Sequence, residues 1–289
     1  MSSTVEVSLT IFNNFLYNHR HAKLCAALYR FRAQVGGRKH GCRRGLAISA
    51  GQNRDFACLR FYRWRPYALS FGYNQSLEKL VDLNAVSDSG LGIVRRMSGG
   101  KMVFHADEHT FSLVLTLELI KDKCPEARTF LDMFRFAIEP LVHSLVDLGV
   151  PARFSSAREM SSGRGNHLHC YAAAAGHSVF AGQHKLIGAA GVFRNDCLII
   201  HGSIPISIVS PPEKVFLSEN RRDLTVKMAA LNEFISDQNI QKLPAATAGH
   251  YAAALGCKLS ESELNETEKQ LAENLFPRYS SLDRPVGIE

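Results

Sequence analysis

A glycine turn among basic residues is the first stretch of the sequence that could do chemistry. Residues 93–115, IVRRMSGGKMVFHADEHTFSLVL, set two arginines, a Ser-Gly-Gly turn and a lysine between apolar runs. Gly99 and Gly100 permit backbone conformations that let a ligand approach the main chain. The surrounding cations and N–H groups could then hold a phosphate or a polarised carbonyl. Taken alone, the string also fits a hairpin turn with solvated arginines.

Cys170 is a second candidate because of its place in the sequence. It follows a loop rich in Ser, Gly and His over 155–169, where a thiol can be reached, whereas a core cysteine lies inside an apolar run. As a thiolate it could act as a nucleophile. The seven cysteines are scattered and include no CxxC pair, so neither a disulfide framework nor a zinc site is indicated.

Small residues follow a lysine in the string HKLIGAAG, which begins at His184. Gly188, Ala189 and Ala190 would leave a hole at a sheet surface through which a linear apolar chain could pass, with the ammonium of Lys185 near its carbonyl end. By itself the string also fits a surface lysine on a strand that ends in a small-residue turn.

The apolar periodicities predict the elements that must position these residues. Strands are expected in the middle of the chain, and helices before and after it. The expected strands are 56–64, 67–75, one on each side of the Ser-Gly-Gly turn, 109–119, and three over 177–206. The expected helices are 12–32, Ser76 to Gly90, 125–150, 211–219, 223–240, 245–256 and 260–276. With no repeat and no linker, this order favours one α+β domain with a helical C-terminal segment.

The composition is that of an ordinary globular protein, with 46% hydrophobic and 21% charged residues in 289. No apolar run approaches the roughly eighteen residues of a spanning helix, and the N-terminus lacks a basic segment followed by an apolar one. We therefore expect a cytoplasmic protein with no membrane partner. The formal charge of +7 favours an acidic partner, but the dispersed basic residues and the lack of a nucleic-acid-binding string argue against nucleic acid.

Four motifs, in this order and at these separations, resemble the biotin and lipoyl protein ligase family, whose members modify one lysine of a carrier domain. They are LRFYRWRPYALSFGYNQ (59–75), the Ser-Gly-Gly stretch, HKLIGAAGVF (184–193) and IIHGSIPI (199–206). The resemblance covers most of the chain. It implies a ligase-like acyltransferase domain over 1–255, built on a mixed, largely antiparallel sheet flanked by helices, with a helical segment 256–289 packed on it.

Within that family the sequence resembles most closely the octanoyltransferases of the Gram-positive type. Lys101 stands where ligases usually have a third glycine, and a basic residue there is typical of the transferases. The transferases also have a cysteine and an aromatic residue fifteen residues before the motif lysine, as Cys170 and Tyr171 stand before Lys185. The resemblance thus implies that Cys170 and Lys185 are catalytic, and that neither a metal nor a cofactor is needed.

The resemblance also implies binding residues and partners. The residues expected to form the wall and mouth of an acyl slot are Arg96, Ser98, Gly99, Gly100, Lys101, His105, Gly188, Ala189 and Ala190. The expected acyl donor is acyl carrier protein, and the expected acceptor is a lipoyl domain or a glycine-cleavage H-type protein. Both partners are acidic proteins, which suits the positive charge of the chain. We expect the enzyme to be a monomer.

The sequence departs from the family pattern in ways that keep alternatives open. The usual Gly-Ser-Ala-Gln is here Gly188 to Gly191, and alanines replace a Pro-Ser expected after Cys170. In a second transferase class a cysteine lies three residues before a His-Gly pair; Cys197 lies four before His201, so we expect it to point away from the site. The alternatives are an ATP-dependent lipoate or octanoate ligase, an amidotransferase between lipoyl carriers, and a non-catalytic binding module.

Overall fold

The computed structural model describes residues 11–13, 23–32, 56–156, 178–217, 228–261 and 266. The strands are β1 (Ile11–Asn13), β2 (Lys23–Arg32), β3 (Phe56–Tyr62), β4 (Ala68–Phe71), β5 (Gly92–Arg95), β6 (Val103–His105), β7 (Glu108–Thr116), β8 (Ala152–Phe154), β9 (Val179–Ala181), β10 (His184–Arg194), β11 (Cys197–Pro205) and β12 (Lys258–Glu261). The helices are α2 (Leu83–Asp88), α3 (Leu117–Lys123), α4 (Phe130–Asp147) and α6 (Asp237–Leu255), with short 3₁₀ turns η2 (Glu213–Val215) and η4 (Leu231–Glu233).

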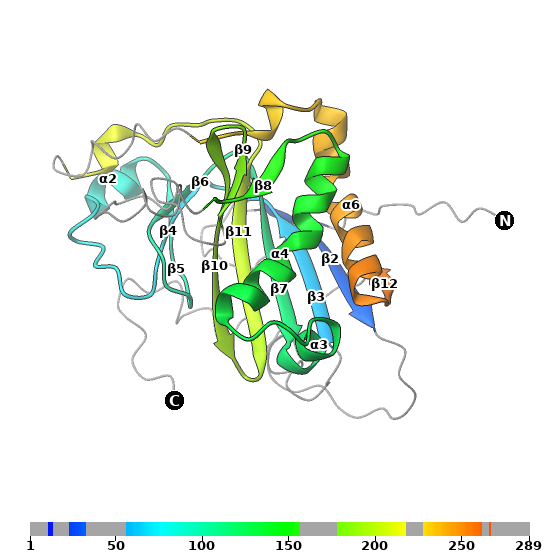
Figure 1. Cartoon of the computed structure of the whole chain (residues 1–289). Coiled ribbons are helices and arrows are strands. Elements are labelled where there is room, and N and C mark those ends of the chain that lie inside the picture. The colour runs from blue at the N-terminus through cyan, green and yellow to red at the C-terminus, as the bar shows by residue number, and fades with distance from the viewer. Residues whose placement is uncertain are drawn as a thin grey trace.

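The strands form two sheets, which Figure 1 shows side by side. The larger sheet has the order β1-β2-β3-β7-β11-β10-β9-β8, with β12 also paired to β2, and the smaller has the order β5-β4-β6. Neighbouring strands are antiparallel except β4 and β5, which are parallel. The expected α+β fold with a mixed, largely antiparallel sheet flanked by helices is thus confirmed.

One face of the larger sheet packs against α4 and α6 (Figure 1). The sequence of α4 places Phe134, Ile138, Leu141 and Leu145 on one side of the helix, and all four are buried in the main core. At its start, the Thr129 side chain and the Asp132 carboxylate exchange hydrogen bonds with each other's backbone N–H groups, which satisfies two otherwise unpaired donors. The sheet therefore presents only its other face to the smaller sheet.

The strands on either side of the glycine turn do not form a hairpin. β5 pairs with one edge of β4 and β6 with the other, so β4 lies between them. The apolar residues of this small sheet pack with α2 and η2 in a second core, which includes Leu69, Phe71, Val86 and Phe216. The chain from β5 to β6 must therefore cross over β4, and the simple hairpin interpretation of the turn is wrong.

Three expected helices differ in the structure. The range 12–32 contains strands β1 and β2, because β2 pairs along its length with β3 and β12 and this ladder outweighs the helical period. The helix expected from Ser76 begins only at Leu83, since the Asp82 side chain accepts hydrogen bonds from two N–H groups of the first turn.

One helix was expected over 223–240. The described residues of this range instead contain the 3₁₀ turn at 231–233, and α6 begins only at Asp237. In the segment 256–289 the described residues 258–261 form strand β12, where a helix was expected; most of the segment lies outside the described residues. The boundary at 255 between the domain and this segment stays a prediction. In the described part of the chain no helix is both long and apolar enough to cross a bilayer.

Candidate active site

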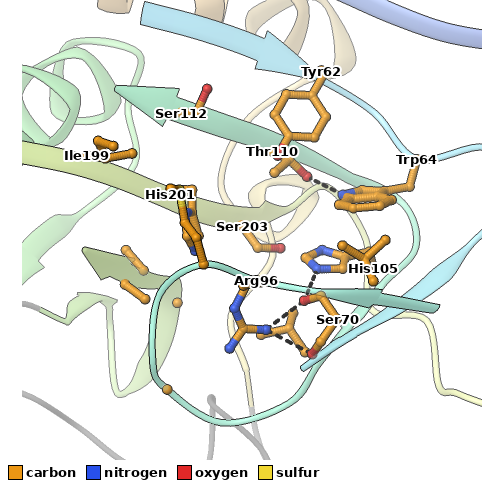
Figure 2. A pocket seen from close by; sticks show the side chains of 18 of the residues that line it. Tyr62, Trp64, Ser70, Arg96, His105, Thr110, Ser112, Ile199, His201 and Ser203 are labelled. Carbon is orange, nitrogen blue, oxygen red and sulfur yellow. Dashed lines mark hydrogen bonds between the residues drawn. The ribbon is translucent and has the colours of Figure 1, made fainter. Parts of the chain in front are cut away.

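A pocket of about 270 Å³ lies where the two sheets meet. Its lining comes from β3, β7, β10 and β11 of the larger sheet, and from β4, β5, β6 and the turn after β5. Figure 2 shows side chains from both sheets pointing into it. Most of the lining surface is apolar, with a limited set of polar groups among the carbon atoms. Such a composition is typical of a site that binds an apolar ligand and orients it through few polar contacts.

The strand register gives the pocket one apolar end and one polar end. Paired residues of neighbouring strands lie side by side on the same face of a sheet. Three rows of paired residues lie on this face. The row at the apolar end is Cys58, Val114, Ile199 and Val192, and the middle row contains Ser112, His201 and Ala190. The row at the polar end is Tyr62, Thr110, Ser203 and Gly188. In Figure 2 Ile199 accordingly lies on one side, and Trp64, His105 and Ser70 lie on the other.

The small residues of β10 allow the glycine turn to close over the sheet. Gly100 has a φ of +96°, and a Cβ added there would lie 3.8 Å from the Cβ of Ala190. A Cβ on Gly72 would lie 1.9 Å from the carbonyl oxygen of Gly100, so that strand end and turn are in direct backbone contact. The Ser98 hydroxyl lies 2.8 Å from Nε2 of His201 on β11. These contacts attach the turn to both sheets.

The two arginines before the turn are not solvated. Arg95 is only 3% exposed, and its Nη1 donates to the carbonyls of Gly72, Tyr73 and Gln75. Arg96 is half-buried; its Nη1 donates to the carbonyl and hydroxyl oxygens of Ser70 at 2.8 and 2.7 Å, and its Nη2 donates to the carbonyl of Lys101 at 2.7 Å. Arg95 thus supports the small sheet, and Arg96 places a positive charge in the pocket wall.

A buried chain of hydrogen bonds crosses from one sheet to the other at the polar end. Nε2 of His105 on β6 lies 2.6 Å from the Ser70 hydroxyl on β4, and Nδ1 lies 2.7 Å from Oε1 of Glu108 on β7. Glu108 also accepts from the hydroxyls of Thr110 and Ser203. Ser70, His105 and Glu108 therefore stand in the order of a serine, a histidine and the carboxylate that orients it.

Burial keeps the imidazole of His201 neutral. Loss of water around this side chain, reinforced by the positive charge of Arg96, lowers its pKa to about 3. Burial also raises the pKa of Tyr62 to about 12, and the guanidinium of Arg60 lies over the Tyr62 ring at 4.8 Å. At neutral pH His201 therefore adds no charge to the centre of the pocket.

The structure brings six of the predicted binding residues into the pocket lining: Arg96, Gly100, His105, Gly188, Ala189 and Ala190. Ser98 is fully buried and bonded to His201, whereas Gly99 is exposed; neither residue lines the pocket. Lys101 is half-buried and contributes its carbonyl to Arg96, but it too stands outside the lining. The glycine turn thus contributes to the site through Gly100.

Of the two predicted catalytic residues, only Lys185 lies among the described residues. Lys185 lies on β10 and is only 5% exposed, so the surface-lysine interpretation is wrong. A lysine that deep is uncommon, and Lys185 is not among the residues that line the pocket. Cys170 falls in the range 157–177, outside the described residues.

Cys197 is buried as expected, but it does not point away from the pocket face. It packs with Cys58, Val114 and Ile199 in the cluster at the apolar end. Residues 197, 199 and 201 alternate with the core residues 198 and 200, so all three share the face that His201 presents to the pocket. Burial raises the pKa of the Cys197 thiol to about 11, which leaves it unreactive at neutral pH.

Several lining residues were missed by the sequence analysis: Tyr62, Trp64, Ser70, Thr110, Ser112, His201 and Ser203. Ser70 and Trp64 lie in the motif at 59–75, and their polar or aromatic type within an apolar run was the available signal. Glu108, which reaches the pocket through His105, was a carboxylate directly before the predicted strand 109–119. Their partners are distant in sequence, so no local pattern could pair them.

The model of the lipoyl protein ligase A/B catalytic domain matches residues 46–247. An octanoyltransferase LipM of Symbiobacterium thermophilum is 31% identical over 245 residues, which cover 80% of this chain and 86% of that protein. Among solved structures, the protein Ta0514 from T. acidophilum, with bound lipoic acid, superposes with a TM-score of 0.60 at 26% identity over 84% of this chain and 93% of its own. Lipoate-protein ligase A bound with ATP superposes with a TM-score of 0.58 at 26% identity, over 81% of this chain and 88% of that protein.

Proposed function

Because the chain belongs to the lipoyl protein ligase A/B catalytic domain family, we propose that it is an octanoyltransferase of lipoate biosynthesis. Its similarity to the LipM octanoyltransferase extends over most of both chains and supports this choice within the family. The acceptor is a lysine of a lipoyl domain or of a glycine-cleavage H-type protein. The donor is octanoyl-acyl carrier protein.

The observation that carries the proposal is the polarity of the pocket. Its volume of about 270 Å³ is just below the range of about 300–1,000 Å³ that holds drug-sized ligands, and suits one unbranched chain of medium length. The apolar row with Ile199 receives the methyl end, and the row with Gly188 and Ser203 receives the carbonyl end. Lys185 lies three residues before Gly188 on the same strand, beyond the polar end.

The proposed reaction has two steps. The thiolate of Cys170 attacks the carbonyl carbon of the donor thioester; a new C–S bond forms, and the carrier leaves as a thiol after taking up one proton. The lysine amine of the acceptor then attacks the octanoyl-enzyme, forms the amide and releases the Cys170 thiol. The ammonium of Lys185 stabilises the negative charge that develops on the oxygen and favours the thiolate. The donor thioester supplies the activation, so the reaction consumes no nucleotide.

The test is incubation with octanoyl-acyl carrier protein in the absence of nucleotide, followed by mass spectrometry of the protein. We expect one octanoyl adduct, mapped to Cys170 and absent from Cys170→Ser. Cys197→Ser is the matched control and should acylate as the wild type does, because the Cys197 thiol is buried and its pKa is raised to about 11. An unlabelled wild-type protein would contradict the proposal.

An ATP-dependent ligase is the second candidate, favoured by the structural likeness to lipoate-protein ligase A bound with ATP. In such an enzyme Lys185 and the glycine turn would hold an acyl-adenylate, and Cys170 would be dispensable. The same assay separates the two activities when free octanoate and ATP replace the acyl carrier protein. Labelling of a lipoyl domain by Cys170→Ser under those conditions would establish the ligase.

A further inference from the structure

We propose that Ser70, His105 and Glu108 form a proton relay that takes the proton from the acceptor amine in the second step of the transfer. The inference rests on the proposed function and deepens it, because it assigns a base to the step that forms the amide. An uncharged amine carries a proton that must leave its nitrogen when the amide forms, and a positioned base accelerates such steps. The following observations assign that task to these three residues.

The hydrogen bonds of Ser70 have a defined direction. Arg96 can only donate, and its Nη1 lies 2.7 Å from the Ser70 hydroxyl oxygen, so this oxygen accepts from Arg96. The hydroxyl proton of Ser70 is therefore available for the His105 nitrogen 2.6 Å away. Nε2 of His105 then accepts, and the proton of the neutral ring lies on Nδ1, facing Glu108 at 2.7 Å. The chain from Ser70 to Glu108 is thus set to move a proton toward His105.

The carboxylate of Glu108 is buried and surrounded by hydrogen-bond donors. It is 3% exposed and accepts hydrogen bonds from His105, Thr110 and Ser203. Thr110 in turn accepts from Nε1 of Trp64 at 2.8 Å, which leaves its own proton for Glu108. A buried carboxylate with this many donors can stabilise an imidazolium next to it. The arrangement provides the charge that His105 needs when it takes up a proton.

The ring of His105 is also fixed in orientation. It stacks on the indole of Trp64 with a centroid distance of 4.4 Å and an interplanar angle of 19°. The charged or titratable groups around the relay are Glu108, which hydrogen-bonds to His105, Arg96, which hydrogen-bonds to Ser70, and His201 on β11. Tyr62 on β3 packs against Trp64. His201 is neutral at neutral pH, so Glu108 and Arg96 are the charged groups that border the relay.

The relay lies at the end of the pocket where the bond changes. Ser70, His105 and Ser203 line the pocket, and Ser203 pairs with Gly188, which lies three residues after Lys185 on β10. Because the other end of the pocket is apolar and receives the octanoyl tail, the octanoyl carbonyl lies at this end. An amine that attacks this carbonyl approaches from the polar side, within the space that the Ser70 hydroxyl borders (Figure 2).

The step balances in protons and electrons. The lone pair of the uncharged amine forms the C–N bond, and the C–S bond to Cys170 breaks with its electron pair on sulfur. One proton passes from nitrogen to the Ser70 oxygen while the Ser70 proton passes to Nε2 of His105, which leaves an imidazolium beside Glu108. The imidazolium then gives its proton to water, the Cys170 thiolate takes up one proton from water, and the relay regains its starting state.

The experiment measures the two steps separately in the full-length protein. Wild type, Ser70→Ala and Glu108→Gln are first acylated with octanoyl-acyl carrier protein, and the rate at which a lipoyl domain removes the octanoyl group is then followed by mass spectrometry. We expect acylation within a few-fold of wild type, transfer slower by about 100-fold or more, and accumulation of the octanoyl-enzyme. The wild-type transfer rate should also fall toward acidic pH, and the fall should be less steep in Ser70→Ala, where only protonation of the acceptor amine still contributes.

Ser144→Ala is the matched control, because Ser144 is as buried as Ser70 and its hydroxyl lies 2.8 Å from that of Thr247 between α4 and α6, in the core and not in the pocket lining. It should transfer octanoyl at the wild-type rate with the wild-type pH profile. Transfer by both relay variants at the wild-type rate, or a stable octanoyl adduct on Ser70, would overturn the relay. A folded Ser70→Ala variant that is not acylated on Cys170 would also overturn the relay, because the relay acts only in the second step. If wild type itself is not acylated on Cys170, the proposed function fails first.

Discussion

The imidazole of His201 shows how a single buried residue links the stability of this protein to pH. Its pKa is about 3 in the folded protein, mainly because of burial, and near 6.5 in an unfolded chain. Between these values the unfolded chain binds a proton that the folded protein does not. Lowering the pH through this window therefore favours unfolding.

We accordingly expect His201→Gln to reduce the pH dependence of stability. From pH 7 to pH 5 the proton taken up by an unfolded His201 costs the wild type up to about 2 kcal/mol, and the variant avoids this loss. Urea unfolding at both pH values measures the difference. His109, whose pKa burial lowers to about 4, leaves a residual dependence of the same sign in both proteins.

Ser98→Ala serves as the control for this prediction. It removes the hydroxyl that lies 2.8 Å from the His201 ring but leaves the ring buried. Because burial is the main cause of the low pKa, this variant should keep the wild-type pH dependence even if its stability falls overall. Equal slopes for wild type and His201→Gln would show that His201 does not control the acid response.

Among the elements, the contact between the end of β4 and the glycine turn decides the shape of the pocket. Gly72 follows β4, and the carbonyl of Gly100 lies where a Gly72 side chain would have to be, at 1.9 Å. The atoms that an added Cβ would meet all belong to the backbone of Gly100, so no side-chain rotation can relieve the contact. The turn would have to move away from Ala190 and from its attachment at His201.

We therefore expect Gly72→Ala to lower the rate of octanoyl transfer by about 100-fold, because displacements of about 1 Å in an active site have effects of this size. Steady-state transfer to a lipoyl domain measures it, and circular dichroism shows whether the fold persists. Gly249→Ala is the control: Gly249 lies in α6, nothing lies within 4 Å of an added Cβ, and alanine should stabilise the helix by about 0.5–1 kcal/mol without affecting transfer. Wild-type transfer by Gly72→Ala would show that the turn adapts.

At the scale of the whole molecule, net charge and pocket act at different stages of the reaction. The chain carries a formal charge of +7, whereas its proposed partners are acidic. Opposite net charges accelerate encounter, and salt screens the attraction. The chemical step takes place inside the pocket, between groups that salt ions screen much less.

We expect the rate of acylation at low donor concentration to fall about tenfold or more between about 0.01 M and about 1 M salt. Stopped-flow measurements with octanoyl-acyl carrier protein would show it. With saturating donor the maximal rate should change little, since encounter no longer limits it. A salt-independent rate at low donor concentration would mean that net charge does not steer the partners together.

Much of the site follows from the sequence because it depends on local spacing. The small residues after Lys185 predicted an opening at the sheet surface for an apolar chain, and the order of four motifs indicated the family. The strands β3, β10 and β11 and the helix α4 could be predicted for the same reason, since their apolar periods are long and regular.

Only the tertiary structure decided which of these residues meet. The order β5-β4-β6 gave the arginines before the turn hydrogen-bond partners on β4 and in the loop that follows it, where a hairpin would have left them in water. Ser70 reaches His105 across 35 positions of sequence, and Ser98 reaches His201 across 103. Residues 23–32 form strand β2 despite their helical apolar period, because their strand partners come from distant segments of the chain. Such pairings depend on the packing of two sheets against each other, which no local pattern encodes.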